Sequence, residues 1–259
     1  MEKRLSSPWD RVQAARSAGR PTARAFIEAM LTDFTPLCGD RRFGEDSAVL
    51  AGPARLHGKP LMVVGLEKGV DTKDKIAHNF GSAQPEGYRK SLRLMKQAEK
   101  FGRPIITFID TPGAYPGKEA EERGQGEAIA SNLVVMSELE TPIVSIVVGE
   151  GGSGGALALA VADRVLMLDN AAYSVVSPEG CASILWKTTD RAADAAEALA
   201  LTAPRLAELG IVDGTITSSG THRELAERII DRVTHELAEL ASLKSDALIE
   251  ARQAKFRAM

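Results

Sequence analysis

The stretch IVSIVVGEGGSGGA, residues 143–156, decides the fold. Its first six residues are apolar apart from Ser145 and mostly β-branched, so they predict a buried strand over residues 143–148. Five glycines follow within residues 149–155, and a helix is expected over residues 153–162. A strand that ends in a glycine turn before a helix is typical of parallel α/β sheets. Such a turn offers backbone N–H groups to an oxygen that carries negative charge.

A second segment with the same order of strand, glycine-bearing loop and helix precedes this one in the chain. Pro104 ends a helical pattern, residues 105–109 predict a strand, and residues 124–139 predict a helix. The loop between them, DTPGAYPG (residues 110–117), also carries glycine. Because ligands of parallel-sheet enzymes bind beyond the carboxyl ends of the strands, we expect this loop and the turn at residues 149–155 to line one crevice.

The remaining pattern fits one α/β domain over residues 1–259. We expect an N-terminal helix and loop at residues 1–50, a core at 51–218 and C-terminal helices at 219–259. Ser177 is predicted to cap the helix that begins at Pro178. Further helices are predicted at residues 20–34, 88–101 and 178–186, strands at 61–66 and 164–168, and a mainly helical tail at 221–256.

Composition excludes several classes of protein. The chain has 259 residues and a formal net charge of -3, which argues against a nucleic-acid-binding protein. Its two cysteines, Cys38 and Cys181, form no CxxC pair, so no metal site is expected on this chain. Residues 1–20 lack the apolar core of a secretory signal, and the apolar run at residues 156–162 is too short to span a membrane. We therefore expect a cytoplasmic protein that binds no membrane.

The glycine turn matches a dinucleotide-binding pattern. Gly149, Gly151 and Gly154 satisfy G-x-G-x-x-G, and Asp169 follows the next predicted strand, where an acid that binds ribose would lie. The helix between these features is very short for such a unit, and the pattern alone is weak.

The same turn matches a nucleophile elbow, because Ser153 is the central residue of G-x-S-x-G. A serine hydrolase of this kind needs a histidine base. The four histidines are His57, His78, His222 and His235, and no local sequence marks any of them as a partner. Without a base, Ser153 is expected to cap the following helix.

An oxyanion hole is the third interpretation. Glycines permit a tight turn, and two N–H groups aimed at one oxygen stabilise negative charge without a histidine, a metal or a ribose-binding acid. The alternative without function is that the glycines only let a helix pack closely on the sheet. Five glycines in seven residues exceed what one turn requires.

Basic residues also occur before the strand predicted at residues 105–109. They are Arg89 and Lys90, in the string Tyr88-Arg89-Lys90, and Arg93. They could attract phosphates, but a basic helix face is more often simply solvated, and we expect that here.

Several long strings resemble the α subunit of the bacterial acetyl-CoA carboxylase carboxyltransferase. The resemblance covers nearly the whole chain from about residue 24 onwards, and the strings occur in the family's order, which makes it highly specific. An N-terminal extension that some family members carry is expected to be missing. The strings are Asn79-Phe80-Gly81, PEGYRK (residues 85–90), residues 107–117, AEERGQ (residues 120–125), residues 149–156 and YSVVSPEGCASILW (residues 173–186).

The resemblance implies a crotonase-like fold, a superhelix of ββα units, with a helical C-terminal tail. It implies a complex of two α and two β subunits that works with biotin carboxylase and the biotin carboxyl carrier protein. Carboxybiotin on the carrier protein and acetyl-CoA are the substrates, and malonyl-CoA for fatty-acid synthesis is the product. No cofactor is expected on this chain, and zinc is expected only on the β subunit.

The resemblance also implies a mechanism that needs no side-chain base. We expect the N–H groups of Gly151 and Gly152 to bind the ureido oxygen of biotin while it carries negative charge. Biotin N1 would then take a proton from the acetyl group. The other residues expected to bind substrate are Gly113, Ala114, Tyr115, Gly149, Ser153 and Gly154. A crotonase-like serine hydrolase that uses Ser153 and a scaffold subunit without turnover are the alternatives.

Overall fold

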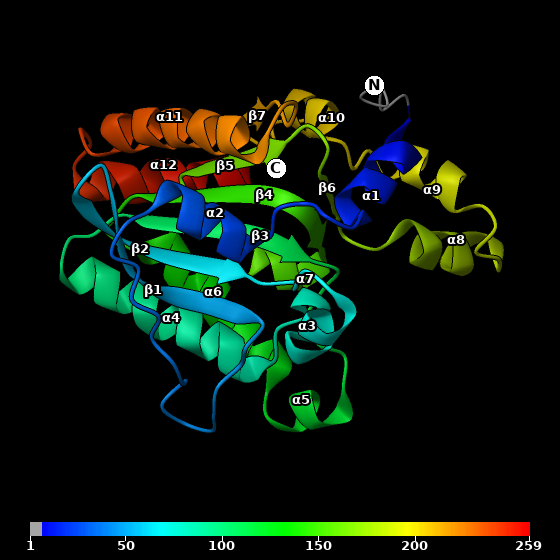
Figure 1. Cartoon of the computed structure of the whole chain (residues 1–259), viewed down its shortest axis with the longest axis horizontal. Coiled ribbons are helices and arrows are strands. Elements are labelled where there is room, and N and C mark those ends of the chain that lie inside the picture. The colour runs from blue at the N-terminus through cyan, green and yellow to red at the C-terminus, as the bar shows by residue number, and fades with distance from the viewer. Residues whose placement is uncertain (1–6) are drawn as a thin grey trace.

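A mixed seven-stranded sheet forms the centre of the computed structural model, which describes residues 7–259 (Figure 1). The strand order is β1-β2-β3-β4-β5-β7, and β6 pairs with the far end of β4. The first pair is antiparallel and all other pairs are parallel. Predictions for residues 1–6 lie outside the described residues. The strands are β1 (Val49–Leu56), β2 (Lys59–Leu66), β3 (Ile105–Thr111), β4 (Ile143–Gly152), β5 (Arg164–Leu168), β6 (Ala172–Ser174) and β7 (Gly214–Ile216).

A tight hairpin joins β1 to β2. His57 and Gly58 form its two-residue loop, and both have positive φ angles, 49° and 74°. This is the geometry of a type I′ turn, whose twist matches that of paired strands. The sequence pattern missed β1, because Gly52 and Pro53 interrupt it. β2 confirms the strand predicted at residues 61–66.

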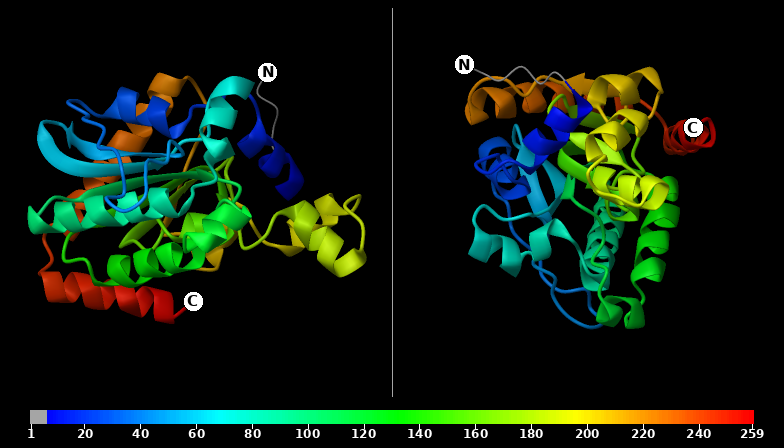
Figure 2. Two further views of the ribbon diagram at one scale, coloured as in Figure 1. Left: turned by 90° about the horizontal axis from the view of Figure 1, so that it is seen from below. Right: turned by 90° about the vertical axis from the view of Figure 1, so that its right-hand side faces the viewer.

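Helices cover both faces of the sheet (Figure 2). On one face lie α2 (Ala23–Met30) and α11 (His222–Leu240), and on the other lie α4 (Pro85–Lys100) and α6 (Gln125–Glu138). α12 (Ser245–Arg257) lies beside α6. Every residue of β3 and nearly every residue of β4 is buried, as expected for strands covered on both sides.

An arm of three helices projects from the end of the sheet where β3 and β4 stop (Figure 1). It consists of α1 (Pro8–Arg16), α8 (Pro178–Trp186) and α9 (Ala192–Ala198). Its small apolar clusters are separate from the main core. The other short helices are α3 (Thr72–Ala77), the 3-10 turn Asn79–Gly81, α5 (Lys118–Glu122), α7 (Ser153–Leu157) and α10 (Ala203–Glu208).

The predicted glycine turn is wrong for residues 149–152. These residues extend β4 to Gly152, because Gly151 and Gly152 pair with Tyr173 and Ser174 of β6. The helix that follows is correspondingly shorter than the predicted 153–162 and ends at Leu157. The predictions at residues 164–168 and 178–186 are confirmed by β5 and α8, including the cap by Ser177. The helical tail is confirmed, with a break at residues 241–244.

The prediction of a solvated basic face on α4 is wrong. Lys90 is 2% exposed, and its Nζ donates hydrogen bonds to the carbonyl oxygens of Asp46 (2.9 Å) and Val49 (2.7 Å). The Arg89 side chain pairs with Asp40 at 2.8 Å. These cations hold the loop before β1 against α4, so they stabilise the fold.

No helix within residues 7–259 is long and apolar enough to cross a membrane.

Candidate active site

The loops after β3 and β4 meet at the end of the sheet, as the sequence predicts. A Cβ atom at Gly152 would lie 2.1 Å from the carbonyl oxygen of Pro112, and one at Gly155 would lie 2.4 Å from the backbone nitrogen of Ala114. Side-chain Cβ atoms never approach this closely, so only glycine fits at both positions. The glycines therefore bring two backbones into contact.

Three backbone N–H groups are free at this junction. Ala114 lies in the loop after β3, and no hydrogen bond from its N–H forms within the described residues. Gly154 and Gly155 lie in the first turn of α7, where an N–H has no partner within its own helix, and no side chain caps this helix. Two converging backbone segments thus present unpaired donors at one place, which is what an oxyanion hole requires.

The residues assigned to this role from the sequence lie slightly apart from these donors. Gly151 is buried against the ring of Tyr173, and Gly152 is the last strand residue. Both belong to a strand that is paired with β6, so their N–H groups are not in the open turn that the sequence predicted. The physical reason is the short strand β6, which extends the ladder and which the sequence pattern missed.

The other predicted site residues divide into two groups. Gly113, Ala114 and Tyr115 are half-buried in the loop after β3, where Gly113 and Ala114 lie beside Gly155. Gly113 has a φ of 148°, and its N–H donates to the Thr111 hydroxyl at 3.0 Å. Gly149, in contrast, is buried.

Gly149 lies beneath an ion pair, because a Cβ atom there would be 2.3 Å from a carboxylate oxygen of Asp110 and 2.4 Å from the Arg20 guanidinium. It is therefore set apart from the exposed part of the junction. Its small size lets the pair pack directly on β4.

Ser153 does not cap α7. The N-cap is Gly152, and Ser153 is the first helical residue, exposed and with a φ of 54°. The prediction of a serine cap is therefore wrong.

None of the four histidines hydrogen-bonds Ser153. His57 lies in the hairpin turn at the opposite end of the sheet, and the His78 ring contacts Asp74. His222 packs on Phe26. His235 pairs with Glu239 at 3.2 Å. The arrangement that a serine hydrolase needs is not formed, so the nucleophile interpretation is not supported.

Asp169, the acid that the dinucleotide interpretation requires, has another role in the structure. A carboxylate oxygen of Asp169 accepts hydrogen bonds from the backbone N–H and the hydroxyl of Ser218, at 2.9 and 2.5 Å. Through this oxygen, Asp169 joins β5 to the segment after β7.

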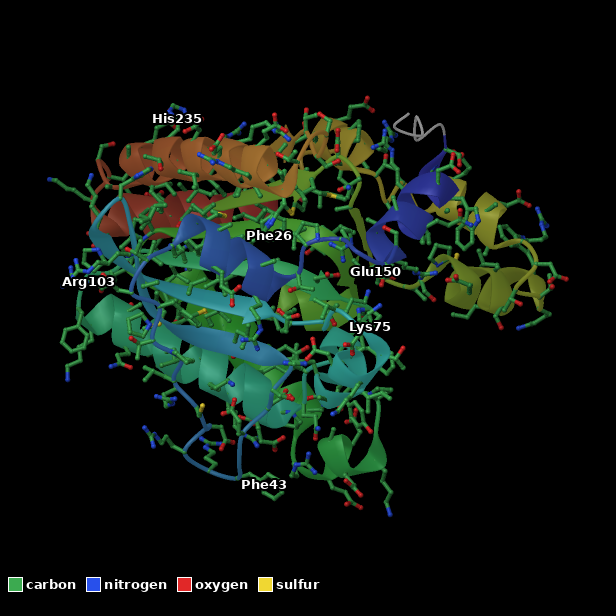
Figure 3. All side chains as sticks on the ribbon, in the orientation of Figure 1. Phe26, Phe43, Lys75, Arg103, Glu150 and His235 are labelled. Atoms are coloured by element: carbon green, nitrogen blue, oxygen red, sulfur yellow. The ribbon has the colours of Figure 1, made fainter. Side chains whose placement is uncertain are left out.

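A buried ionic cluster fixes the ends of β3 and β4, and Glu150, one of its members, is labelled in Figure 3. Asp110, which is fully buried, pairs with Arg20, and its other oxygen accepts the Glu150 N–H at 3.0 Å. The Glu150 carboxylate in turn pairs with Lys68 and with Arg16, the latter at 2.5 Å. Residues from α1, the segment before α2, β3 and β4 are thereby joined directly beneath the two loops.

The charge of Glu150 is stabilised by this cluster. Burial alone would raise the pKa of its carboxyl group, but Lys68 and Arg16 outweigh burial and hold the pKa below its usual value of 4.5. Arg16 also pairs with Glu179 of α8 at 2.5 Å, and these two carboxylates raise the pKa of its guanidinium against the effect of burial. The arm is therefore tied to β4 through Arg16.

We expect the substitution Glu150→Gln to lower stability at neutral pH by about 1–3 kcal/mol, because a charged hydrogen-bond acceptor is lost. A carboxyl group with a lowered folded-state pKa stabilises the fold above its unfolded-state pKa. That contribution is lost as the pH falls through the folded-state value. The difference in unfolding free energy between wild type and variant should therefore shrink as the pH falls below 4.5, measured by urea unfolding. A difference independent of pH from 7 to 3 would contradict this role.

Sequence reasoning missed Arg16, Arg20 and Lys68. They come from segments far from the glycine loops in the chain, and nothing in their local sequence distinguishes them from solvated cations. Tyr88 was recognised only as part of a basic helix, yet its hydroxyl lies 3.3 Å from the Gly155 carbonyl oxygen. Burial raises the pKa of this hydroxyl, so it remains protonated and can donate that bond.

Within the residues that the structure describes, no three histidine, cysteine or acidic side chains gather into a group that could hold a metal ion.

The chain is similar over its whole length to known proteins. A family model for acetyl co-enzyme A carboxylase carboxyltransferase-like proteins matches residues 3–259. The acetyl-coenzyme A carboxylase carboxyl transferase subunit alpha of Staphylococcus carnosus is 54% identical over 255 residues, 96% of this chain and 81% of that protein. The protein of the same name from Ruminiclostridium cellulolyticum is 54% identical over 252 residues, 97% of each chain.

Solved structures show the same fold at low sequence identity. A chain of a Pseudomonas malonate decarboxylase hetero-tetramer in complex with coenzyme A superposes with a TM-score of 0.70 at 17% identity, covering 93% of this chain and 92% of that one. A chain of transcarboxylase 12S superposes with a TM-score of 0.68 at 20% identity, and the match covers 85% of this chain and 42% of that one. The expected crotonase-like fold is confirmed. By the family model and by its identity to full-length relatives, the chain belongs to the family of acetyl-coenzyme A carboxylase carboxyltransferase α subunits.

Proposed function

We propose that this chain is the α subunit of an acetyl-CoA carboxylase carboxyltransferase that acts in the cytoplasm. It transfers the carboxyl group of carboxybiotin, carried by the biotin carboxyl carrier protein, to acetyl-CoA, and the malonyl-CoA formed serves fatty-acid synthesis. Family membership supports the reaction class. The junction of the two loops, with the free N–H groups of Ala114, Gly154 and Gly155, is the observation that supports the site.

The N–H groups at the junction hold the ureido oxygen of biotin. When the carboxyl group leaves, negative charge develops on this oxygen, and preorganised donors stabilise it most when water is excluded. Each donor contributes on the order of 3 kcal/mol in such a site. The donors Ala114 and Gly154 replace Gly151 and Gly152 in this role. Gly152 has a different role, which is to let the loop after β3 approach β4, whereas Gly151 makes room for the ring of Tyr173.

No side chain of this subunit acts as the base. The Ser153 hydroxyl has no histidine partner, and the nearby carboxylates of Asp110 and Glu150 are engaged with Arg20 and Lys68. Biotin N1, once its carboxyl group has left as CO2, takes the proton from the acetyl methyl group, and the enolate formed attacks that CO2 to give malonyl-CoA. The protein contributes by orienting the reactants and by stabilising charge.

The site is completed by partner proteins. The curated relatives are named as α subunits, so the chain works within a carboxyltransferase of more than one kind of subunit. We propose two α and two β subunits, with the β subunit binding the acetyl-CoA thioester and carrying the zinc. Biotin carboxylase supplies the carboxylated carrier protein. This chain itself holds no cofactor in the proposal.

Reconstitution tests the proposal. The purified chain is mixed with its β partner, carboxylated carrier protein and acetyl-CoA, and malonyl-CoA is measured. We expect turnover only when both subunits are present. Absence of turnover in an assembled complex would indicate a scaffold subunit, and thioester hydrolysis by this chain alone would indicate a hydrolase.

Ser153→Ala separates the transferase from the hydrolase interpretation. Because Ser153 is exposed and its hydroxyl activates nothing, we expect carboxyl transfer by the reconstituted complex within about threefold of wild type, since surface changes rarely exceed 0.5 kcal/mol. A serine-directed covalent probe should leave the wild-type chain unlabelled. A loss of more than a hundredfold, together with labelling of Ser153, would contradict the proposal.

A further inference from the structure

A second pocket lies at the end of the sheet opposite the glycine loops. Its volume is about 400 Å³, and it lies between the β1–β2 turn, the segment before β3 and α11. In Figure 3, Arg103 marks this end of the molecule and Glu150 marks the other. Because the pocket lies where β3 begins and the proposed active site lies where β3 ends, the two do not overlap.

The lining of this pocket is apolar. It includes Leu56, Leu61, Pro104, Leu237 and Ala238, and no acidic residue lines it. Leu56 and Leu61 form its deep part, since both are at most 5% exposed, and Ala238 lies on the exposed side of α11. Apolar clefts of several hundred Å³ with a few polar groups are the usual form of small-molecule sites.

Three exposed basic residues also line the pocket. His57, Lys59 and Arg103 come from two different segments. None of their side chains forms an ion pair or hydrogen bond with any residue from 7 to 259. Arg55, which lies nearby on β1, shows the contrast, because it pairs with Asp33 at 3.2 Å. An apolar pocket with the unpaired cations Lys59 and Arg103 at its rim has the charge pattern that complements an anion carrying an apolar body.

We propose that this pocket binds an amphiphilic carboxylate, an unbranched aliphatic chain that ends in one carboxylate group. The chain would lie along Leu56, Leu61 and Leu237, where it loses contact with water. The carboxylate would reach Arg103, whose planar guanidinium matches a carboxylate in a bidentate pair, and Lys59. An apolar segment of a partner protein would leave these cations unmatched, which is why we favour the small anion. The proposal does not depend on the carboxyl-transfer function.

Titration calorimetry of the full chain with dodecanoate, below its micelle concentration, tests the proposal. We expect saturable binding at one site. Lys59→Glu combined with Arg103→Glu should weaken binding at least tenfold by repelling the carboxylate. Ala238→Phe should weaken it similarly by occupying the pocket. All three positions are exposed or lie on the exposed side of a helix, so the fold should survive these changes.

Lys73→Glu is the matched control, because it is an exposed lysine at the other end of the molecule, on α3, and should leave affinity unchanged. 1-Dodecanol tests the head group and should bind at least tenfold more weakly than dodecanoate. Three outcomes would overturn the proposal. These are no saturable binding, affinity that the pocket variants do not change, and equal affinity for the alcohol, which would indicate a plain apolar contact surface.

Discussion

Gly152→Val should abolish carboxyl transfer in the reconstituted complex while leaving the complex assembled. A Cβ atom at residue 152 would lie 2.1 Å from the Pro112 carbonyl oxygen and 2.3 Å from its carbonyl carbon. These are backbone atoms of the neighbouring loop, so the loop itself must move. The movement carries the N–H group of Ala114 away from those of α7. Losing one aligned donor lowers turnover by about a hundred- to a thousandfold.

The fold should survive this substitution. Overpacking of a close contact costs about 1–3 kcal/mol, whereas domains are stable by about 5–15 kcal/mol. Gly154→Ala, in the first turn of α7, is the control, because its Cβ would meet only the Ile129 side chain at 3.8 Å and its N–H is retained. Malonyl-CoA formation and gel filtration with the β subunit measure the two properties. Near-normal turnover of Gly152→Val, or equal loss in both variants, would contradict the account.

Arg252→Ala should greatly lower the stability of the fold. Arg252 is 1% exposed and lies on α12. Its guanidinium pairs with both carboxylate oxygens of Asp163, at 2.8 and 2.9 Å, and donates to the carbonyl oxygens of Met136, Leu139 and Thr141. Removing it leaves the buried Asp163 carboxylate without its ion-pair partner. Breaking a buried pair in this way costs about 3–5 kcal/mol.

The loss of the Arg252 side chain should also disturb β4. The Asp163 carboxylate also accepts a hydrogen bond from the N–H of Ile143, at 2.7 Å. Ile143 is the first residue of β4, the strand that carries the glycines. Arg257→Ala is the control, since Arg257 lies on the same helix but is exposed and bonds only Gln253. Urea unfolding of the three proteins measures the difference. A loss for Arg252→Ala no greater than that for Arg257→Ala, about 0.5 kcal/mol or less, would show that the buried pair does not stabilise the fold.

The core of the fold could be predicted from the sequence. The strands β3, β4 and β5 contain apolar runs, which local sequence alone reveals. Ser177 and Pro178 likewise determine where α8 begins. The convergence of the loops after β3 and β4 followed from the rule for parallel strands and is confirmed by the contact of Gly152 with Pro112.

The remaining features depend on contacts between distant residues. The sequence did not predict β6, a three-residue strand that depends on pairing with distant residues at the end of β4 and at Leu201 and Thr202. That pairing moves the open donors from Gly151 and Gly152 to Gly154 and Gly155. Likewise, Arg16 and Arg20 acquire their roles only because α1 and the segment after it lie against Asp110 and Glu150. A local pattern carries no information about such partners.

The most direct test of the central claim is a structure of the αβ complex with biotin bound. The account predicts that the ureido oxygen lies about 2.7–3.1 Å from the backbone nitrogen of Ala114 and from that of Gly154 or Gly155. A ureido oxygen held by side chains, or by the β subunit alone, with no N–H of these two loops within hydrogen-bonding distance, would contradict it.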